Sequence, residues 1–242
     1  MEQDWIYGLL GGVMIGLGGA VYLLANGRIM GASGILGGLV DGSGRDTWKE
    51  RAAFLFGVFV LPILVFPFFN GVETHVSQNW LVIIAAGLLV GVGTRFANGC
   101  TSGHGGLFGT GLFISGMTDT SKVQGWLDIF GNWDPTLAFV MGGAIVPMFF
   151  AWRLTNGRKP IVGGAFPTPP EPKIGRNRVL GSVLFGFGWG LAGLCPGPAI
   201  ASLSYGGIMH WVFVVAMLAG MYMAPNLRGR MDRVLDRTVA AE

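Results

Sequence analysis

Seven apolar stretches, separated by polar or glycine-rich segments, divide this 242-residue chain. A straight helix needs about 20 apolar residues to cross a bilayer, and several of these stretches are shorter. Short apolar segments broken by glycine are typical of the discontinuous helices around a transporter's binding site. The pattern predicts an all-α, polytopic membrane protein with short broken or re-entrant helices. The stretches cover roughly residues 7–25, 52–69, 79–97, 107–118, 135–152, 179–194 and 206–224.

The composition excludes several classes of protein. Hydrophobic residues make up 51% of the chain and charged residues only 12%, against about 25% charged in soluble domains. This excludes a disordered chain and argues against a soluble enzyme. No Walker A loop, nucleophile elbow, zincin motif or Rossmann fingerprint occurs in a suitable context, so neither enzymatic activity nor ATP-driven transport by this chain alone is expected.

The basic residues are clustered between the apolar stretches. Of 16 Lys and Arg residues, six lie in 153–178, four in 228–237 and three in 45–51. The positive-inside rule explains this placement, so the basic pI predicts a lipid bilayer and not nucleic acid as the partner. We expect a multi-pass protein of the bacterial inner membrane with an external N-terminus and a cytoplasmic C-terminus. Residues 157–178 are expected to form a cytoplasmic linker, and 225–242 a polar tail that is loose or a short surface helix.

Two pairs of segments indicate an internal duplication. Residues 91–100 and 186–195 both read G-x-G-x-x-x-A-x-x-C, and Arg28-Ile-Met-Gly31 matches Lys122-Val-Gln-Gly125 at nearly the same offset. The sequence thus predicts two repeats, about 8–104 and 105–224, within a single membrane domain. Three apolar stretches separate the two cysteines, and an odd number of crossings would invert the second repeat relative to the first.

The core of each repeat ends in a cysteine-containing segment rich in helix breakers, and in the second repeat a further apolar stretch, 206–224, follows it. Irregular backbone at membrane depth is tolerated where it lines a cavity, and its N–H groups can face an anion. The alternative is that each cysteine is a small buried hydrophobe, but their equivalent repeat positions favour a functional role. The predicted substrate-binding residues are Asn98, Gly99, Cys100, Thr101, Ser102, Gly103 and His104 in the first segment and Cys195, Pro196, Gly197 and Pro198 in the second.

Three basic residues are further candidates for attracting an anion. Arg95 lies within an apolar stretch, where a charge usually marks a pathway or a partner, although it could instead snorkel to the surface. Arg28 and Lys122 occupy matching repeat positions; they could flank two vestibules or simply anchor helix ends. His75 and His210 lie near span ends and are expected at the membrane interface.

Metal binding is not expected. Cys100 and His104 are four residues apart, but the surrounding glycines make a helix doubtful there. Two thiols and one nearby imidazole also fall short of a structural zinc set. We expect neither a metal nor a cofactor.

The two cysteine segments resemble those of the YeeE/YedE membrane proteins. Residues 98–105 and 186–199 are similar to that family's two signature segments, and the stretches 111–118 and 134–139 are similar as well. The resemblance covers about residues 8–224. It implies an inner-membrane fold of inverted repeats with re-entrant helices, in which Cys100 and Cys195 briefly engage thiosulfate. This chain lacks a helix, often with a further cysteine, that the family has after the first segment, because His104-Gly105 runs almost directly into the second repeat.

Three hypotheses follow. The leading one is a permease for thiosulfate or a related sulfur-containing anion. The second is a membrane thiol protein that relays sulfur as a persulfide to a soluble sulfur-carrier protein. The third is a structural membrane subunit in which neither cysteine matters.

Overall fold

In a computed structural model of the protein, every regular element in the described part of the chain is a helix. Among the described residues, seven longer helices each overlap one of the seven apolar stretches, with different ends. They are α1 (Glu2–Asn26), α3 (Trp48–Val65), α4 (Trp80–Phe96), α5 (Gly105–Ile114), α7 (Thr136–Thr155), α8 (Arg176–Ala192) and α10 (Ile208–Val239). Three shorter elements are α6 (Thr120–Leu127), α9 (Pro196–Ala201) and the 3-10 turn η3 (Ser202–Ser204). The described residues are 2–26, 38–40, 42, 48–65, 74–76, 79–96, 105–155, 157–160, 166 and 176–239.

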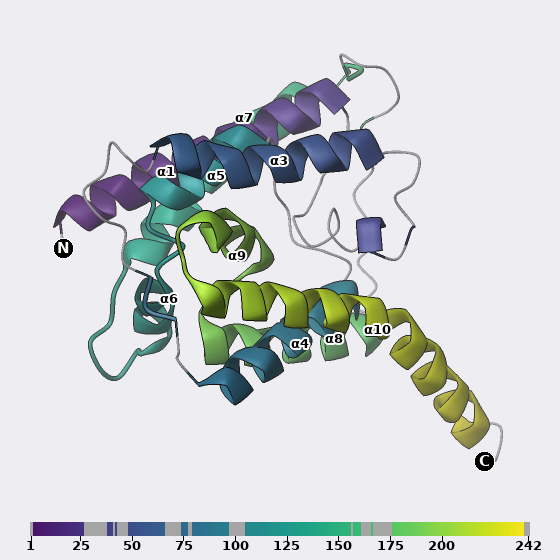
Figure 1. Cartoon of the computed structure of the whole chain (residues 1–242). Helices are drawn as coiled ribbons and strands as arrows, with labels where there is room; N and C mark the ends of the chain where they lie inside the picture. Colours follow the sequence, from purple (N-terminus) through teal and green to yellow (C-terminus); the bar gives the residue numbers. More distant parts are fainter. Residues whose placement is uncertain are drawn as a thin grey trace.

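The helices form two layers with α9 between them (Figure 1). One layer contains α1, α3, α5 and α7, and the other contains α4, α8 and α10. The short helix α9 contacts α5 and α3 in one layer and α10 in the other. Consequently the residues next to α9 lie at the centre of the molecule.

A row of glycines on α1 lets it pack closely against α7. A Cβ at Gly16 would lie 2.9 Å from the Ala144 Cα, and one at Gly8 would lie 3.2 Å from the Thr136 side chain. Only glycine permits such an approach of two backbones, as in small-residue interfaces of membrane helices. Since successive glycines of α1 meet successive turns of α7, these two helices run parallel.

The same contacts fix the direction of other helices. Gly87 of α4 faces Phe213 of α10, and Gly91 of α4 faces Met221, so α4 and α10 also run parallel. In contrast, α1 and α5 are antiparallel, because Gly11 meets Ser115 whereas Gly111 meets Ile15. Helices α1, α4, α7 and α10 all begin at the end of the molecule that holds the N-terminus, on the left in Figure 1.

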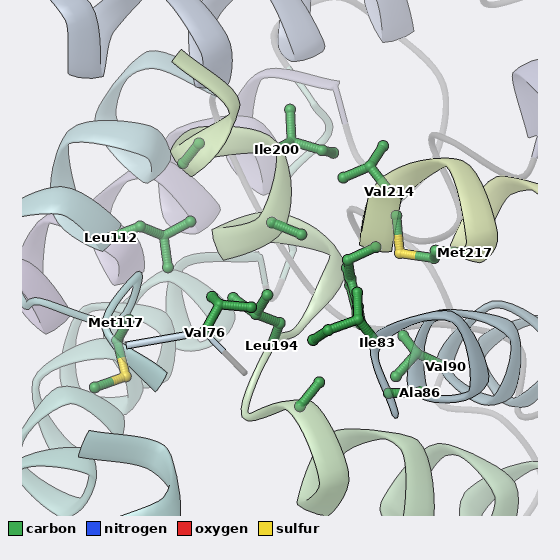
Figure 2. Packing of buried hydrophobic residues seen from close by; sticks show 14 of the residues in the cluster. Val76, Ile83, Ala86, Val90, Leu112, Met117, Leu194, Ile200, Val214 and Met217 are labelled. Carbon is green, nitrogen blue, oxygen red and sulfur yellow. The ribbon is translucent and has the colours of Figure 1, made fainter. Parts of the chain in front are cut away.

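The hydrophobic core joins the two layers (Figure 2). Leu112 and Met117 come from one layer, Ile83 and Met217 from the other, and Leu194 lies between them. Leu194 and Ile83 are fully buried. The segment beside the second cysteine is therefore part of the buried core.

The outward faces of the helices are apolar, as a lipid-facing surface requires. On α7, for instance, Ile145, Phe149 and Phe150 are exposed. Three helices are long and apolar enough to cross a membrane, within Asp4–Val21, Thr136–Thr155 and Ile208–Leu227, and the bent pair α8 and α9 would make a fourth span. These candidates were found among the described residues. Each predicted apolar stretch overlaps a helix, but not every one of those helices is long enough to be a complete span.

One predicted boundary differs from the structure. The tail after residue 224 was expected to be loose or a short surface helix, yet α10 continues through Pro225 to Val239. Proline removes one backbone hydrogen bond but tolerates helix on both sides. The polar tail is thus a continuation of the last apolar helix.

Candidate functional site

The break between α8 and α9 bends the chain by 44°. The N–H of Gly193 donates to the Trp189 carbonyl at 2.7 Å, and Gly193 has a φ of +67° that only glycine adopts readily. Cys195 then has extended backbone as the N-cap, and Pro196 begins α9. A glycine that ends one helix, followed by a proline that begins the next, makes the break a property of the local sequence.

Cys195 is half-buried and directly precedes α9, the helix that contacts both layers. Leu194 before it is fully buried, and every residue of α9, from Pro196 to Ala201, is buried. The cysteine is therefore the accessible position in a segment that is otherwise enclosed. A partly accessible thiol at the centre of a membrane protein can contact a solute that enters between the layers.

The N-terminus of α9 offers few backbone donors. Pro196 and Pro198 have no N–H, and the N–H of Ala199 donates to the Cys195 carbonyl at 3.0 Å. Of the first four residues of α9, Gly197 is the one whose N–H is neither removed by proline nor bonded within this turn, among the backbone contacts of the described residues. A six-residue helix with two prolines cannot act as the strong positive end that the sequence suggested, so an anion here needs side-chain donors.

Side-chain hydroxyls occur where the chain packs on the break. Thr118 precedes α6, Thr120 is its first residue, and both are buried. A Cβ at Gly193 would lie 2.9 Å from the Thr120 Cβ, so the start of α6 packs directly on the break. Tyr205, after η3, places its ring edge-on against Phe113, with ring centroids 5.5 Å apart, and its hydroxyl faces Thr118. The surroundings of the second break thus include neutral hydroxyl groups.

Lys122 has a structural partner. Its Nζ lies 3.1 Å from the Asp4 carboxylate, which joins α6 to the start of α1. This contact favours the helix-end anchor over the anion-attracting role. Nearby, the ring of the exposed His75 lies 3.0 Å from the Asp119 carboxylate, and the Thr120 hydroxyl donates to the His75 carbonyl.

The structure brings together only the second of the two predicted segments. Cys195, Pro196, Gly197 and Pro198 adjoin one another at the break. Arg95 belongs to α4, but its side chain lies outside the described part of the structure. The remaining predicted residues also lie outside the described residues: Arg28, Asn98, Gly99, Cys100, Thr101, Ser102, Gly103 and His104.

Sequence reasoning missed the burial of His210 and the hydroxyl groups. His210 lies near the start of a candidate span, Ile208–Leu227, and its side chain, in the first turn of α10, is buried. The physical reason is the Gly206-Gly207 turn, which has room for the ring against its backbone. Thr118 and Thr120 could have been found as polar residues at and just after the end of the apolar stretch 107–118. No group of three or more potential metal ligands occurs among the residues searched, which are those the structure describes.

Comparison with known proteins places the chain in a family. Residues 100–235, more than half of the chain, match a family described as "Family of unknown function (DUF6691)". The chain belongs to this family. The match begins at Cys100 and includes α5 to α9 and most of α10. It therefore contains both cysteines and the whole second break.

Several shorter bacterial proteins are similar to this chain. A protein of Xylella fastidiosa strain 9a5c named "Probable transporter" is 40% identical over 149 residues, which are 61% of this chain and 90% of that protein. A second, from strain Temecula1 and with the same name, is 45% identical over 136 residues, or 55% of this chain and 87% of its own. A third, also from Temecula1, is 44% identical over 106 residues, or 43% and 76%. No solved structure matches.

Proposed function

We propose that this protein is a bacterial inner-membrane permease for thiosulfate or a related sulfur-containing anion. The main observation is the bent α8–α9 pair, whose break holds the half-buried Cys195 next to a helix that contacts both layers. The name "Probable transporter" of the similar proteins supports transport in general. The resemblance of both cysteine segments to the YeeE/YedE proteins supports sulfur as the transported element.

The helix pairing supports an inverted repeat. Suppose that α1, α3 and α4 of the first repeat correspond, in that order, to α5, α7 and α8 of the second. The counterpart of the α1–α7 contact is then the α5–α3 contact. Both contacts exist, and the corresponding helices also pair with each other as α1–α5 and α4–α8. Corresponding helices of an inverted repeat must run in opposite directions, as α1 and α5 do. Binding would then occur where the repeats meet.

The charge distribution supports an orientation. Arg153, Arg158 and Lys159 lie at or just beyond the end of α7, on the side where α10 also ends. The opposite end carries Asp4, and the Asp134 carboxylate accepts from the first residue of α7. Basic segments remain in the cytoplasm, so we assign the N-terminal end of the layers to the outside of the cell.

The surroundings of Cys195 suit a soft anion held weakly. Thiosulfate is a dianion, and burying it without compensating donors would cost many kcal/mol. Thr118 and Tyr205 can supply hydroxyl donors, and a protonated thiol adds a weak donor that suits a sulfur acceptor. No fixed cation is among these groups, so the ion can leave again. We propose that Cys195 and Cys100 are successive non-covalent contacts along the path.

Growth of a sulfur-auxotrophic bacterium with thiosulfate as its sulfur source tests this function. Cells that express the chain should grow, and cells that express a Cys100→Ala, Cys195→Ala double variant at equal membrane levels should not. Near-normal growth of the double variant would refute the mechanism. Mass spectrometry of both cysteines after exposure to thiosulfate tests the alternative, since a stable persulfide would indicate a sulfur relay to a soluble carrier protein.

A further inference from the structure

The two layers differ in how many helices they contain. Among the described residues, one layer has the order α7, α1, α5, α3, and the other has the order α10, α4, α8. Exchange of the two proposed repeats swaps α1 with α5 and α3 with α7, so it leaves the order of the first layer unchanged. The same exchange swaps α4 with α8, and it therefore requires a helix beside α8 that corresponds to α10 beside α4. No helix that the structure describes takes this place, so α8 forms the edge of its layer.

The helix absent beside α8 is the one that the first repeat lacks. Helix α10 follows the break at Cys195, so its counterpart would follow Cys100. Residues 97–104 alone separate α4 from α5, and they are too few for a membrane-crossing helix, which needs about 20 residues. A helix beside α8 must therefore come from elsewhere.

The contact between α4 and α10 indicates what kind of helix fits such a place. A Cβ at Gly87 would lie 2.8 Å from the Ala216 Cβ, and Gly91 packs closely on the next turn of α10. On the α10 side, a Cβ at Gly220 would lie 2.5 Å from the Leu88 carbonyl oxygen. Small residues on both helices thus bring the two backbones together, which is how membrane helices commonly associate.

The equivalent positions of α8 are also small, but they are uncovered. By the alignment of residues 91–100 with 186–195, Gly186 corresponds to Gly91 and Ser182 to Gly87. Ser182 and Gly186 are exposed, and no described atom lies within 4 Å of a Cβ at Gly186. Helix α8 meets α4 on another side, where a Cβ at Gly188 would lie 2.8 Å from the backbone of α4. The face with Ser182 and Gly186 is therefore free to receive a second helix.

We propose that a second copy of this chain binds the α8 face formed by Ser182 and Gly186, and that it does so with its own α8. The proposal uses the repeat inferred above and does not depend on which solute is transported. The absent helix would run parallel to α8, as α10 runs parallel to α4. Two copies related by a two-fold axis along the membrane normal also place their α8 helices parallel.

The face of α8 is suited to pairing with itself. The second α8 presents small residues four positions apart, as α10 presents Ala216 and Gly220 to α4. Val183 and Phe187, the residues that follow Ser182 and Gly186, are exposed. In a parallel pair, these apolar side chains of one copy pack beside the small residues of the other. Each copy therefore supplies both the groove and the helix that fills it.

Disulfide cross-linking of the full-length chain in native membranes tests this pairing. Residues at a two-fold contact approach their own copies, and a disulfide requires Cα atoms about 4.4–6.8 Å apart. On oxidation with copper–phenanthroline, Ser182→Cys should give at least five times more covalent dimer than the parent, whose native cysteines set the background. Adding Gly186→Leu fills the groove and should remove most of this gain. Adding Gly142→Leu should not, because Gly142 is an equally open glycine on α7, in the other layer.

The samples are compared at equal membrane levels of the protein. Gly186→Leu should reach the parental level, since no described atom surrounds the new side chain. Absence of extra dimer in both Ser182→Cys and Gly186→Cys would overturn the proposal. A gain that persists when Gly186→Leu is added to Ser182→Cys would place the contact on another face and refute it equally. A cross-link to a different protein, identified by mass spectrometry, would assign the face to a separate subunit instead of a second copy.

Discussion

Gly143 of α7 lies against the backbone of Leu9 in α1: a Cβ at Gly143 would stand 2.6 Å from the Leu9 carbonyl oxygen. The preceding residue, Gly142, faces open space, with nothing within 4 Å of the same atom. The two adjacent glycines of α7 therefore differ in their surroundings: α1 packs against Gly143 and not against Gly142.

This pair yields a matched test of the α1–α7 contact. Both Gly143→Ala and Gly142→Ala gain about 0.5–1 kcal/mol of helix propensity. Only Gly143→Ala must also separate two backbones, which costs about 1–3 kcal/mol by overpacking. We expect Gly143→Ala to lower the midpoint of thermal unfolding in detergent and Gly142→Ala to leave it unchanged or raise it. Equal midpoints would contradict the close contact.

The left-handed residue at the break gives a second prediction. Gly193→Ala would place a side chain at a φ of +67° and against Thr120. We expect a cost of about 1–2 kcal/mol from the backbone alone, with loss of most thiosulfate uptake as α9 shifts. Gly190→Ala is the control, because nothing lies within 4 Å of a Cβ there. Uptake that falls equally in both variants would show that the bend itself is not what matters.

The thiol gives a third prediction. Cys195→Ala should lower uptake at least tenfold, because it removes the soft donor from the accessible position of the break. Cys195→Ser should recover little, since the hydroxyl is shorter, harder and more strongly hydrated. Initial rates of radiolabelled thiosulfate uptake, normalised to protein in the membrane, measure the effect. A serine variant with parental rates would show that any small donor suffices.

The Lys122–Asp4 contact gives a fourth prediction. If Lys122 anchors α6 to α1, then Lys122→Gln should change the KM for thiosulfate by less than about threefold. Exposed ion pairs contribute about 0–1 kcal/mol, and Asp4 is half-exposed, so Asp4→Asn should have a similarly small effect on stability. A KM that rises tenfold or more in Lys122→Gln, and depends on ionic strength, would instead assign the lysine to anion attraction.

Orientation gives a fifth prediction. Phe130 and Lys159 are exposed and lie beyond opposite ends of α7. A membrane-impermeant maleimide should add label to Phe130→Cys in intact spheroplasts, but to Lys159→Cys only after lysis. The parent chain, with its two native cysteines, gives the background labelling. Reversed accessibility would invert the assignment of the two faces.

The positions of the helices could be predicted well from sequence. Apolar runs specify membrane helices because the bilayer demands continuous backbone hydrogen bonding. The break at Cys195 was also predictable, since glycine and proline interrupt a helix locally. The end of α10 was not, because Pro225 disfavours helix without forbidding it and the polar residues beyond it are good helix formers.

The surroundings of the break could not be predicted in the same way. Thr120 packs on Gly193 of the break and Tyr205 packs on Phe113, and both contacts join residues far apart in sequence. Likewise, His210 looks like an interface residue when only its distance from the end of an apolar run is considered. Its burial depends on how α10 docks on α4 and on the turn before it, which periodicity does not encode.

The partner of α1 is α7, and α3 to α6 come between them in the chain. During synthesis the first helix enters the membrane long before the surface that fits its glycines exists. Until α7 is made, the glycine surface of α1 faces lipid. Another helix can then bind it incorrectly, or a quality-control protease can degrade the chain. Assembly of the first half thus depends on translation of the second, and a chain that stops before α7 should be degraded instead of accumulating.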